Sequence, residues 1–118
     1  MFDPLEAVVS WASDILGAPV MTYPDPPDGA SIFGVVTRTG GDVDWPHDWP
    51  SFAIQVWAES DAEAEQGAYL LAIGAKTRPP ADAGILEVRT PSMYSYGRED
   101  GGWYVWQTTI PLAVNLNM

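Results

Sequence analysis

The sequence predicts an α+β domain in which two helices pack on one face of a mainly antiparallel, four-stranded sheet. Two segments start with helix-capping residues and continue with apolar residues at helical spacing. Four other segments have the β-branched content or the alternation of strands, and glycine or proline bounds them. Their order is helix, strand, strand, helix, strand, strand, which favours helices gathered on one side of a sheet. The 118 residues, 47% of them hydrophobic, fit one domain spanning residues 1–118.

The first helix is expected to begin after Asp3 and to end at Gly17. Asp3 is a suitable N-cap, Pro4 suits the first helical position, and Glu6 follows three residues after the cap. Apolar residues then recur at helical spacing up to Leu16. Residues 18–30 are rich in proline, so we expect an irregular connection there.

Two strands are expected next, joined as a long hairpin. Residues 31–39 have the β-branched content of a strand, which Gly40 and Gly41 end. Residues 51–59 alternate, with Phe52, Ile54, Val56 and Ala58 on one face. The segment from Asp42 to Pro50 is expected to be a loop.

The second helix is expected to follow the capping box Ser60-Asp61-Ala62-Glu63 and to end before Pro79 and Pro80. Acidic residues near its start and basic residues near its end suit the helix dipole. Four apolar residues, three of them alanine, supply one smooth face that can lie close to a sheet. These are Ala64, Ala68, Leu71 and Ala75.

The last two strands are expected at residues 84–90 and 103–116. The long final segment places Tyr104, Trp106 and Thr108 on the face that continues with Ile110, Leu112 and Val114. Pro111 lies inside this segment, which predicts an edge position or a bulge.

Charge is distributed unevenly along the chain. Sixteen acidic and five basic residues give a net charge of −11, and the sequence pI is about 4.1. Up to Ala75 there are twelve acids and one base, whereas four acids and four bases follow from Lys76 onward. Such a surface repels phosphate, which argues against reading of nucleic acid and against binding to anionic membranes. An acidic and a balanced region can instead join copies of the chain or its partners through unlike charges.

The residues that carry chemistry are few. The chain has no cysteine, which excludes disulfides and thiol catalysis. His47 is the single histidine, so no second imidazole can share a catalytic or metal-binding role with it. A pocket around His47 with a perturbed carboxylate would revive an enzyme interpretation, but the sequence predicts no enzyme, no cofactor and no metal. No signal peptide and no apolar run of membrane-spanning length occurs, so a soluble protein made in a cytoplasm is expected.

The aromatic residues indicate a protein interface. Six tryptophans are more than a small core of two helices and one sheet needs. Trp45 and Trp49 lie in the loop, whereas Trp57 and Trp103 lie on the sheet face opposite the main apolar rows. Loop tryptophans can also fold back and cover the sheet. A sheet with aromatic residues on both faces nevertheless needs something on its second side, and another subunit can supply it.

The chain resembles the tail terminator (tail completion) proteins of long-tailed bacteriophages. The similarity lies in Val35-Val36-Thr37-Arg38-Thr39-Gly40-Gly41, a short acidic loop, and Phe52–Glu59 running straight into an alanine-rich helix. A Tyr- and Arg-containing turn at Tyr94–Arg98 and a long final strand at 103–116 complete it. The resemblance covers about residues 4–116, and the double Trp-Pro loop departs from the family pattern.

The resemblance implies a ring, typically a hexamer, on the head-proximal end of the tail tube. Such a ring stops tube polymerisation and docks onto the connector of the head. The implied partners are other copies of the chain, the major tail tube protein and a head–tail connector or stopper protein, with genomic DNA only passing through. The implied location is the tail neck of a virion. The candidate interface residues are Arg38, Asp42, Asp44, Trp45, Trp49, Trp57, Arg89, Tyr96, Arg98 and Trp103.

Two hypotheses connect charge to this ring. Arg38, Arg89 and Arg98 are expected to meet acids of the adjacent subunit. Some acids of the loop at 42–48, or of the first turn of the second helix, are expected to face the channel or the tube, since a negative wall does not retain DNA. Two other interpretations remain: another neck component such as a stopper or adaptor, and a generic acidic adaptor that binds one partner through its aromatic loop.

Overall fold

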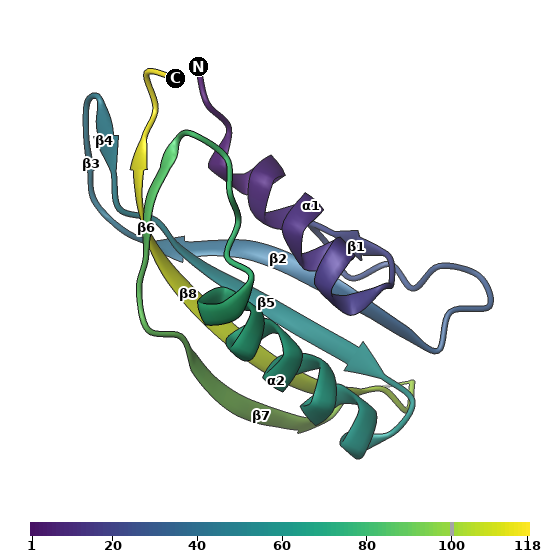
Figure 1. The fold of residues 1–118 in the computed structure, drawn as a ribbon. Coiled ribbons are helices and arrows are strands. Elements are labelled where there is room, and N and C mark those ends of the chain that lie inside the picture. The colour runs from purple at the N-terminus through teal and green to yellow at the C-terminus, as the bar shows by residue number, and fades with distance from the viewer. Residues whose placement is uncertain (100) are drawn as a thin grey trace.

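The computed structural model describes residues 1–99 and 101–118, so Asp100, one of the acids counted above, lies outside the described residues. It contains two helices and an open, mixed sheet of eight strands, which confirms the α+β class (Figure 1). The expected number of four strands is wrong, because short strands extend the sheet to eight. The sheet is mainly antiparallel, as predicted, with one parallel pair. The elements are α1 (Pro4–Leu16), β1 (Val20–Met21), β2 (Ile32–Gly40), β3 (Val43–Asp44), β4 (His47–Asp48), β5 (Ser51–Ala58), α2 (Asp61–Thr77), β6 (Ile85–Val88), β7 (Ser92–Arg98) and β8 (Tyr104–Asn115).

Strand β8 is the centre of the sheet. Its first residues pair with β5 on one side and β7 on the other, and its last residues pair with β4 and β6. β2 continues the sheet beyond β5, and β1 adds two residues in parallel to β2. The sheet path is therefore β1-β2-β5-β8, with the short β4–β3 hairpin at the end of β8.

Pro111 lies in this central strand, so the expected edge position is wrong. Its carbonyl accepts a hydrogen bond from the Arg89 N–H at 2.9 Å. The N–H and C=O of a strand residue point to the same side of the strand. The backbone N–H that Pro111 lacks would therefore point toward Arg89, as its carbonyl does. That side is the gap between β6, whose pairing ends at Val88–Leu112, and β7, whose pairing starts at Ser92–Thr109. Proline is tolerated where β8 changes partner.

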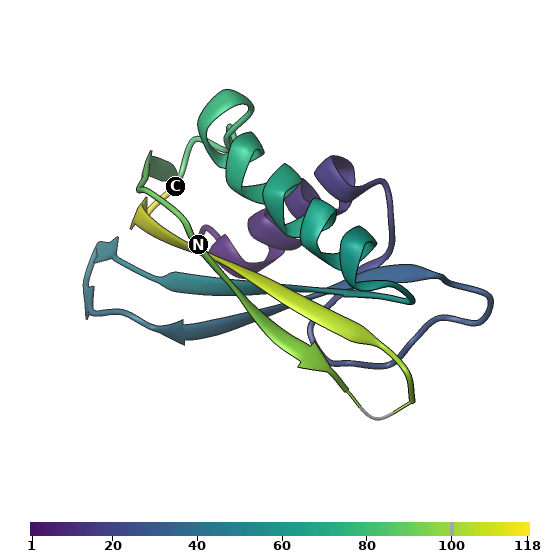
Figure 2. The ribbon, with the colours of Figure 1, turned by 90° about the horizontal axis from the view of Figure 1, so that it is seen from below.

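Both helices cover the same face of the sheet, as the sequence predicts (Figure 2). The Asp3 side chain accepts from the Glu6 N–H at 3.1 Å, and Gly17 ends α1 with φ +61°. The Ser60 hydroxyl caps α2 in the same way, at 3.2 Å from the Glu63 nitrogen. The helices bury the predicted apolar rows against the sheet. The core consists of Val8, Trp11, Ala12, Val36, Phe52, Ile54, Val56, Ala68, Leu71, Ala75, Ile110, Leu112 and Val114.

α2 lies close to the sheet because its inner face is made of small residues. A Cβ on Gly67 would lie 2.7 Å from Val56 Cγ1, too close for a real contact. The Thr108 hydroxyl donates to the Ala68 carbonyl at 2.7 Å, so a buried polar side chain of β8 also fastens the helix.

Three expected irregular segments contain strands. β1 lies within the proline-rich connection, and β3 and β4 form a small hairpin within the loop at 42–50. The expected turn at Tyr94–Arg98 is wrong, because these residues belong to the edge strand β7. β7 is mostly exposed and has no apolar alternation. Its ladder to β8, with a bulge between Ser95 and Gly97, holds it in place.

Candidate protein interface

Figure 2 shows that both helices lie on one face of the sheet and leave the other face, here called the open face, without a helix. The strand register and the ring contacts place a cluster of aromatic side chains on the open face. The register places Phe33 beside Trp57 on this open face. Their rings stack with centroids 5.5 Å apart, and Trp103 meets Phe33 edge-on at 5.1 Å. Phe33 is fully buried, whereas both tryptophans remain half-buried. The aromatic cluster therefore covers Phe33 at the end of the open face where β2 begins and β5 ends, and it leaves indole surface for a partner.

A polar network lies beside this cluster. The Gln107 amide donates to the Tyr94 hydroxyl at 3.1 Å and to Thr109 at 3.0 Å, and its oxygen accepts from Tyr96 at 2.9 Å. Tyr94 and Tyr96 also share a hydrogen bond between their hydroxyls. That hydrogen bond, with some loss of hydration, raises the pKa of Tyr96 above its ordinary value of 10.0. These groups form an ordered polar rim on which both tyrosines stay exposed.

The segment Gly41–Trp49, here called the arm, extends from one end of the sheet, away from both helices (Figure 1). It contains the β3–β4 hairpin, and the Trp49 N–H donates to the Asp42 carbonyl at 2.9 Å. Trp45 is 61% exposed and Trp49 is 38% exposed. The indole of Trp45 thus lies at the surface instead of folding back onto the sheet.

Arg38 and Asp48 form a bidentate ion pair at the base of the arm. Both guanidinium–carboxylate distances are 2.8 Å, and Arg38 also donates to the carbonyls of Gly40 and Gly41 at 3.1 Å. The Asp48 side chain is 3% exposed and that of Arg38 33%. The hydrogen bond to Asp48 raises the pKa of Arg38. Most Arg38 donors are therefore used within the chain, and Asp48 is not a free charge facing a channel.

The other two predicted arginines lie apart from each other. Arg98 lies over the Tyr104 ring, 5.8 Å from its centroid, at the far end of β7. Arg89 lies 3.5 Å from Glu87 in an exposed ion pair next to β6.

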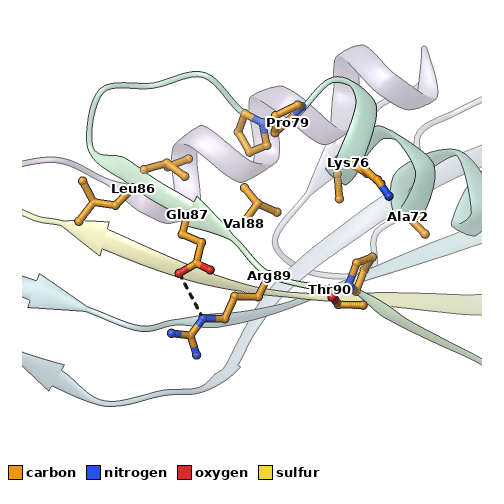
Figure 3. A pocket seen from close by; sticks show the side chains of 12 residues that line it. Ala72, Lys76, Pro79, Leu86, Glu87, Val88, Arg89 and Thr90 are labelled. Carbon is orange, nitrogen blue, oxygen red and sulfur yellow. Dashed lines mark ion pairs between the residues drawn. The ribbon is translucent and has the colours of Figure 1, made fainter.

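A groove lies between the C-terminal half of α2 and β6 (Figure 3). Its volume is about 580 Å³, and it is open to solvent. Ala72, Ala75 and Val88 contribute apolar surface, whereas Lys76 and Arg89 bring positive charge. The groove was not predicted from the sequence. It exists because β6 pairs with β8 and so lies next to α2, and this pairing joins segments that are far apart in the sequence.

The ten predicted interface residues thus fall in separate places. Trp57, Trp103 and Tyr96 share the open face. Asp42, Asp44, Trp45 and Trp49 belong to the arm, with Arg38 at its base. Arg89 lines the groove, and Arg98 lies at the end of β7. Sequence reasoning missed the roles of Phe33, Tyr94 and Lys76, whose positions follow from strand pairing rather than from a local pattern.

Within residues 1–99 and 101–118, no group of three or more His, Asp or Glu side chains could hold a metal ion. No helix in this part of the chain is long and apolar enough to cross a membrane.

Comparison with solved structures shows a shared fold. A chain from the virion of a native gene transfer agent particle superposes with a TM-score of 0.56. The match covers 88% of this chain and 84% of that chain at 15% sequence identity. No protein-family model and no curated protein sequence matches the chain.

Proposed function

We propose that this chain is a structural virion protein that forms a closed ring, a hexamer, on the head-proximal end of a phage tail tube. The ring ends tube polymerisation and joins the tail to the head–tail connector, and genomic DNA passes through its lumen. Its partners are other copies of itself, the tube protein and the connector or stopper. In this role the protein binds and positions, and it catalyses no reaction.

The observation that carries the proposal is the open face of the sheet. Both helices cover one face, so within residues 1–99 and 101–118 no helix covers the aromatic cluster of Phe33, Trp57 and Trp103. Aromatic side chains with exposed area and a polar rim are typical of protein interfaces. The fold shared with a virion chain supports assembly into a particle, and so does the resemblance in sequence described above.

The charge distribution fits a ring in which unlike patches meet. A ring requires a heterologous interface, where one patch binds a different patch of the neighbour. Asp61 and Glu63 lie at the start of α2, whereas Lys76 lies near its end. We place Arg98 against acids of the adjacent subunit, and the acids of the first turn of α2 toward the channel or the tube, where negative charge lets DNA slide.

The test combines electron microscopy with a tube-length assay. The protein is imaged alone and after mixing with its tube protein, and six-fold rings and shorter, capped tubes are expected. Trp103→Ala removes indole surface from the open face and is expected to abolish capping. Tyr69→Ala is the matched control, because Tyr69 is 52% exposed on α2, which covers the opposite face. Unchanged tube lengths with the wild-type protein would refute the proposal.

Arg98→Glu gives a second, independent test. It is expected to weaken ring assembly in native mass spectrometry, because a like charge then faces the neighbouring acids. If the ring forms equally well, the role assigned to Arg98 is wrong.

A further inference from the structure

We propose that the arm of one copy docks into the groove between α2 and β6 of a second copy, with Trp45 as the anchor. This inference rests on the proposed ring and names the contact that joins neighbouring subunits. The juxtaposed elements are an exposed, acidic and aromatic hairpin and an open, apolar groove with a basic rim.

The arm is suited to insertion because its tip is exposed and its base is fixed. Trp45 is flanked by Asp44, and Asp42 lies on the same hairpin, all with exposed side chains. The Arg38–Asp48 pair and the pairing of β4 with Asn115 and Val114 hold the arm to the sheet. A hairpin that is already ordered loses little conformational entropy when it binds.

The groove fits an indole and its acidic neighbours. Its volume of about 580 Å³ lies within the roughly 300–1,000 Å³ of pockets that bury a drug-sized ligand, which is larger than an indole. Figure 3 shows Val88 and Ala72 lining it, with Lys76 and Arg89 coming from different elements. Lys76 comes from the last turn of α2, where positive charge is also favoured by the helix dipole.

The charges of the two surfaces are complementary. Asp42 and Asp44 give the arm tip two negative charges. Lys76 and Arg89 give the groove two positive charges, and Glu87 subtracts one, which leaves +1. The groove is thus one of the few positive places on a chain of net charge −11. That scarcity favours a second copy of this chain, whose arm is acidic, over a basic partner.

The topology makes the contact intermolecular. β4 and β6 pair with the same end of β8, on its two opposite edges. The arm of a chain is therefore separated from its own groove by β8. Arm and groove are different patches, so their contact is heterologous and can repeat around a ring.

The test uses two variants of the full-length protein, each with one half of the contact removed. Trp45→Ala with Asp44→Lys removes the arm's anchor and reverses one of its charges. Lys76→Glu with Arg89→Glu reverses the charges of the groove. We expect each variant alone to self-associate much more weakly. Its dissociation constant, measured by light scattering and native mass spectrometry, should be higher by a factor of about 30 or more. An equimolar mixture is expected to form one-to-one dimers, since one intact arm then meets one intact groove.

Two controls separate this contact from a general loss of surface. Tyr23→Ala removes an aromatic side chain that is as exposed as Trp45 but lies outside the arm, and it should leave assembly unchanged. Lys76→Arg with Arg89→Lys keeps the groove's charge and should retain assembly. Circular dichroism checks that each variant is folded.

The outcomes of this test differ from those of the proposed function. If both interface variants still form rings like those of the wild type, the arm–groove contact is overturned, and the tube-capping proposal is unaffected. Two variants that stay monomeric when mixed would also overturn it. A wild-type protein that is monomeric at all concentrations would overturn the contact as well, whereas tube capping is judged separately by tube length.

Discussion

Removing Arg38 should destabilise the protein strongly, because Asp48 would be left as a buried, unpaired carboxylate. Arg38 donates two hydrogen bonds to Asp48 at 2.8 Å and two more to the Gly40 and Gly41 carbonyls at 3.1 Å. Breaking a buried ion pair by removing one partner costs roughly 3–5 kcal/mol. The Arg38 side chain is 33% exposed, so solvent screening lowers the expected loss to about 2–3 kcal/mol.

The assay is urea unfolding of Arg38→Ala, followed by tryptophan fluorescence. A loss of about 2–3 kcal/mol lowers the folding equilibrium constant roughly 30- to 150-fold. Arg38→Lys keeps the charge but not the fork of donors, so it should recover only part of the stability. Arg38→Ala combined with Asp48→Asn should cost less than the sum of the two single changes. A single variant within about 0.5 kcal/mol of the wild type would refute the reasoning, since that is the ordinary effect of a surface change.

Three further outcomes follow from the contacts described above. The fold stabilises the neutral phenol of Tyr96, so this contribution to stability is complete below pH 10.0 and is lost as the pH rises through the raised pKa of Tyr96. Alkaline difference absorbance should therefore show one tyrosine that ionises late, and Tyr96→Phe should remove it. A titration curve that Tyr96→Phe leaves unchanged would contradict this. Thr108→Val deletes the 2.7 Å bond to the Ala68 carbonyl and should lower the free energy of unfolding by about 1 kcal/mol in urea; equal stability would show that the bond adds nothing. Gly67→Ala should lower the melting temperature, because the new Cβ would lie 2.7 Å from Val56 Cγ1. Overpacking costs about 1–3 kcal/mol, whereas the gain in helix propensity is about 1 kcal/mol. Adding Val56→Ala should relieve the clash, and a Gly67→Ala variant with a higher melting temperature would refute this prediction.

Local sequence signals predicted the helices and the two strands that build the core. The caps at Asp3 and Ser60 and the alternation of residues 51–59 depend only on neighbours a few residues away. The same holds for the small-residue face of α2. Each of these patterns is buried or hydrogen-bonded as predicted, because local chemistry and the overall fold agree there.

The errors arise where distant segments decide the structure. β7 is mostly exposed and polar, and it becomes a strand through distant segments: its ladder to β8 and the packing of Met93 against the core. Pro111 predicted an edge, but the change of partner on β8 removes the need for its N–H. These arrangements have no signature in the residues themselves.

The candidate interface was predicted in its residue types more than in its geometry. Trp45 and Trp49 are predicted to lie in the loop, where they either fold back over the sheet or face a partner, and the structure exposes both. Arg38 was expected to be available to a neighbour, but the hairpin brings Asp48, ten residues away, into bidentate contact with it. Lys76 and Arg89 line the same groove because β6 pairs with β8, the strand that α2 covers.

The central position of β8 determines when the protein can fold during synthesis. β4, β5, β6 and β7 all pair with residues 104–115, so none of them has its full set of strand partners until those residues have left the ribosome. Until then, the apolar row of β5 and the inner face of α2 lack the strand that completes their shared core. Most sheet contacts therefore form late and across long sequence separations, which slows folding. The strand edges that pair with β8 stay exposed in the nascent chain until β8 is synthesised. The acidic first two thirds of the chain keeps nascent chains apart by charge repulsion during this time.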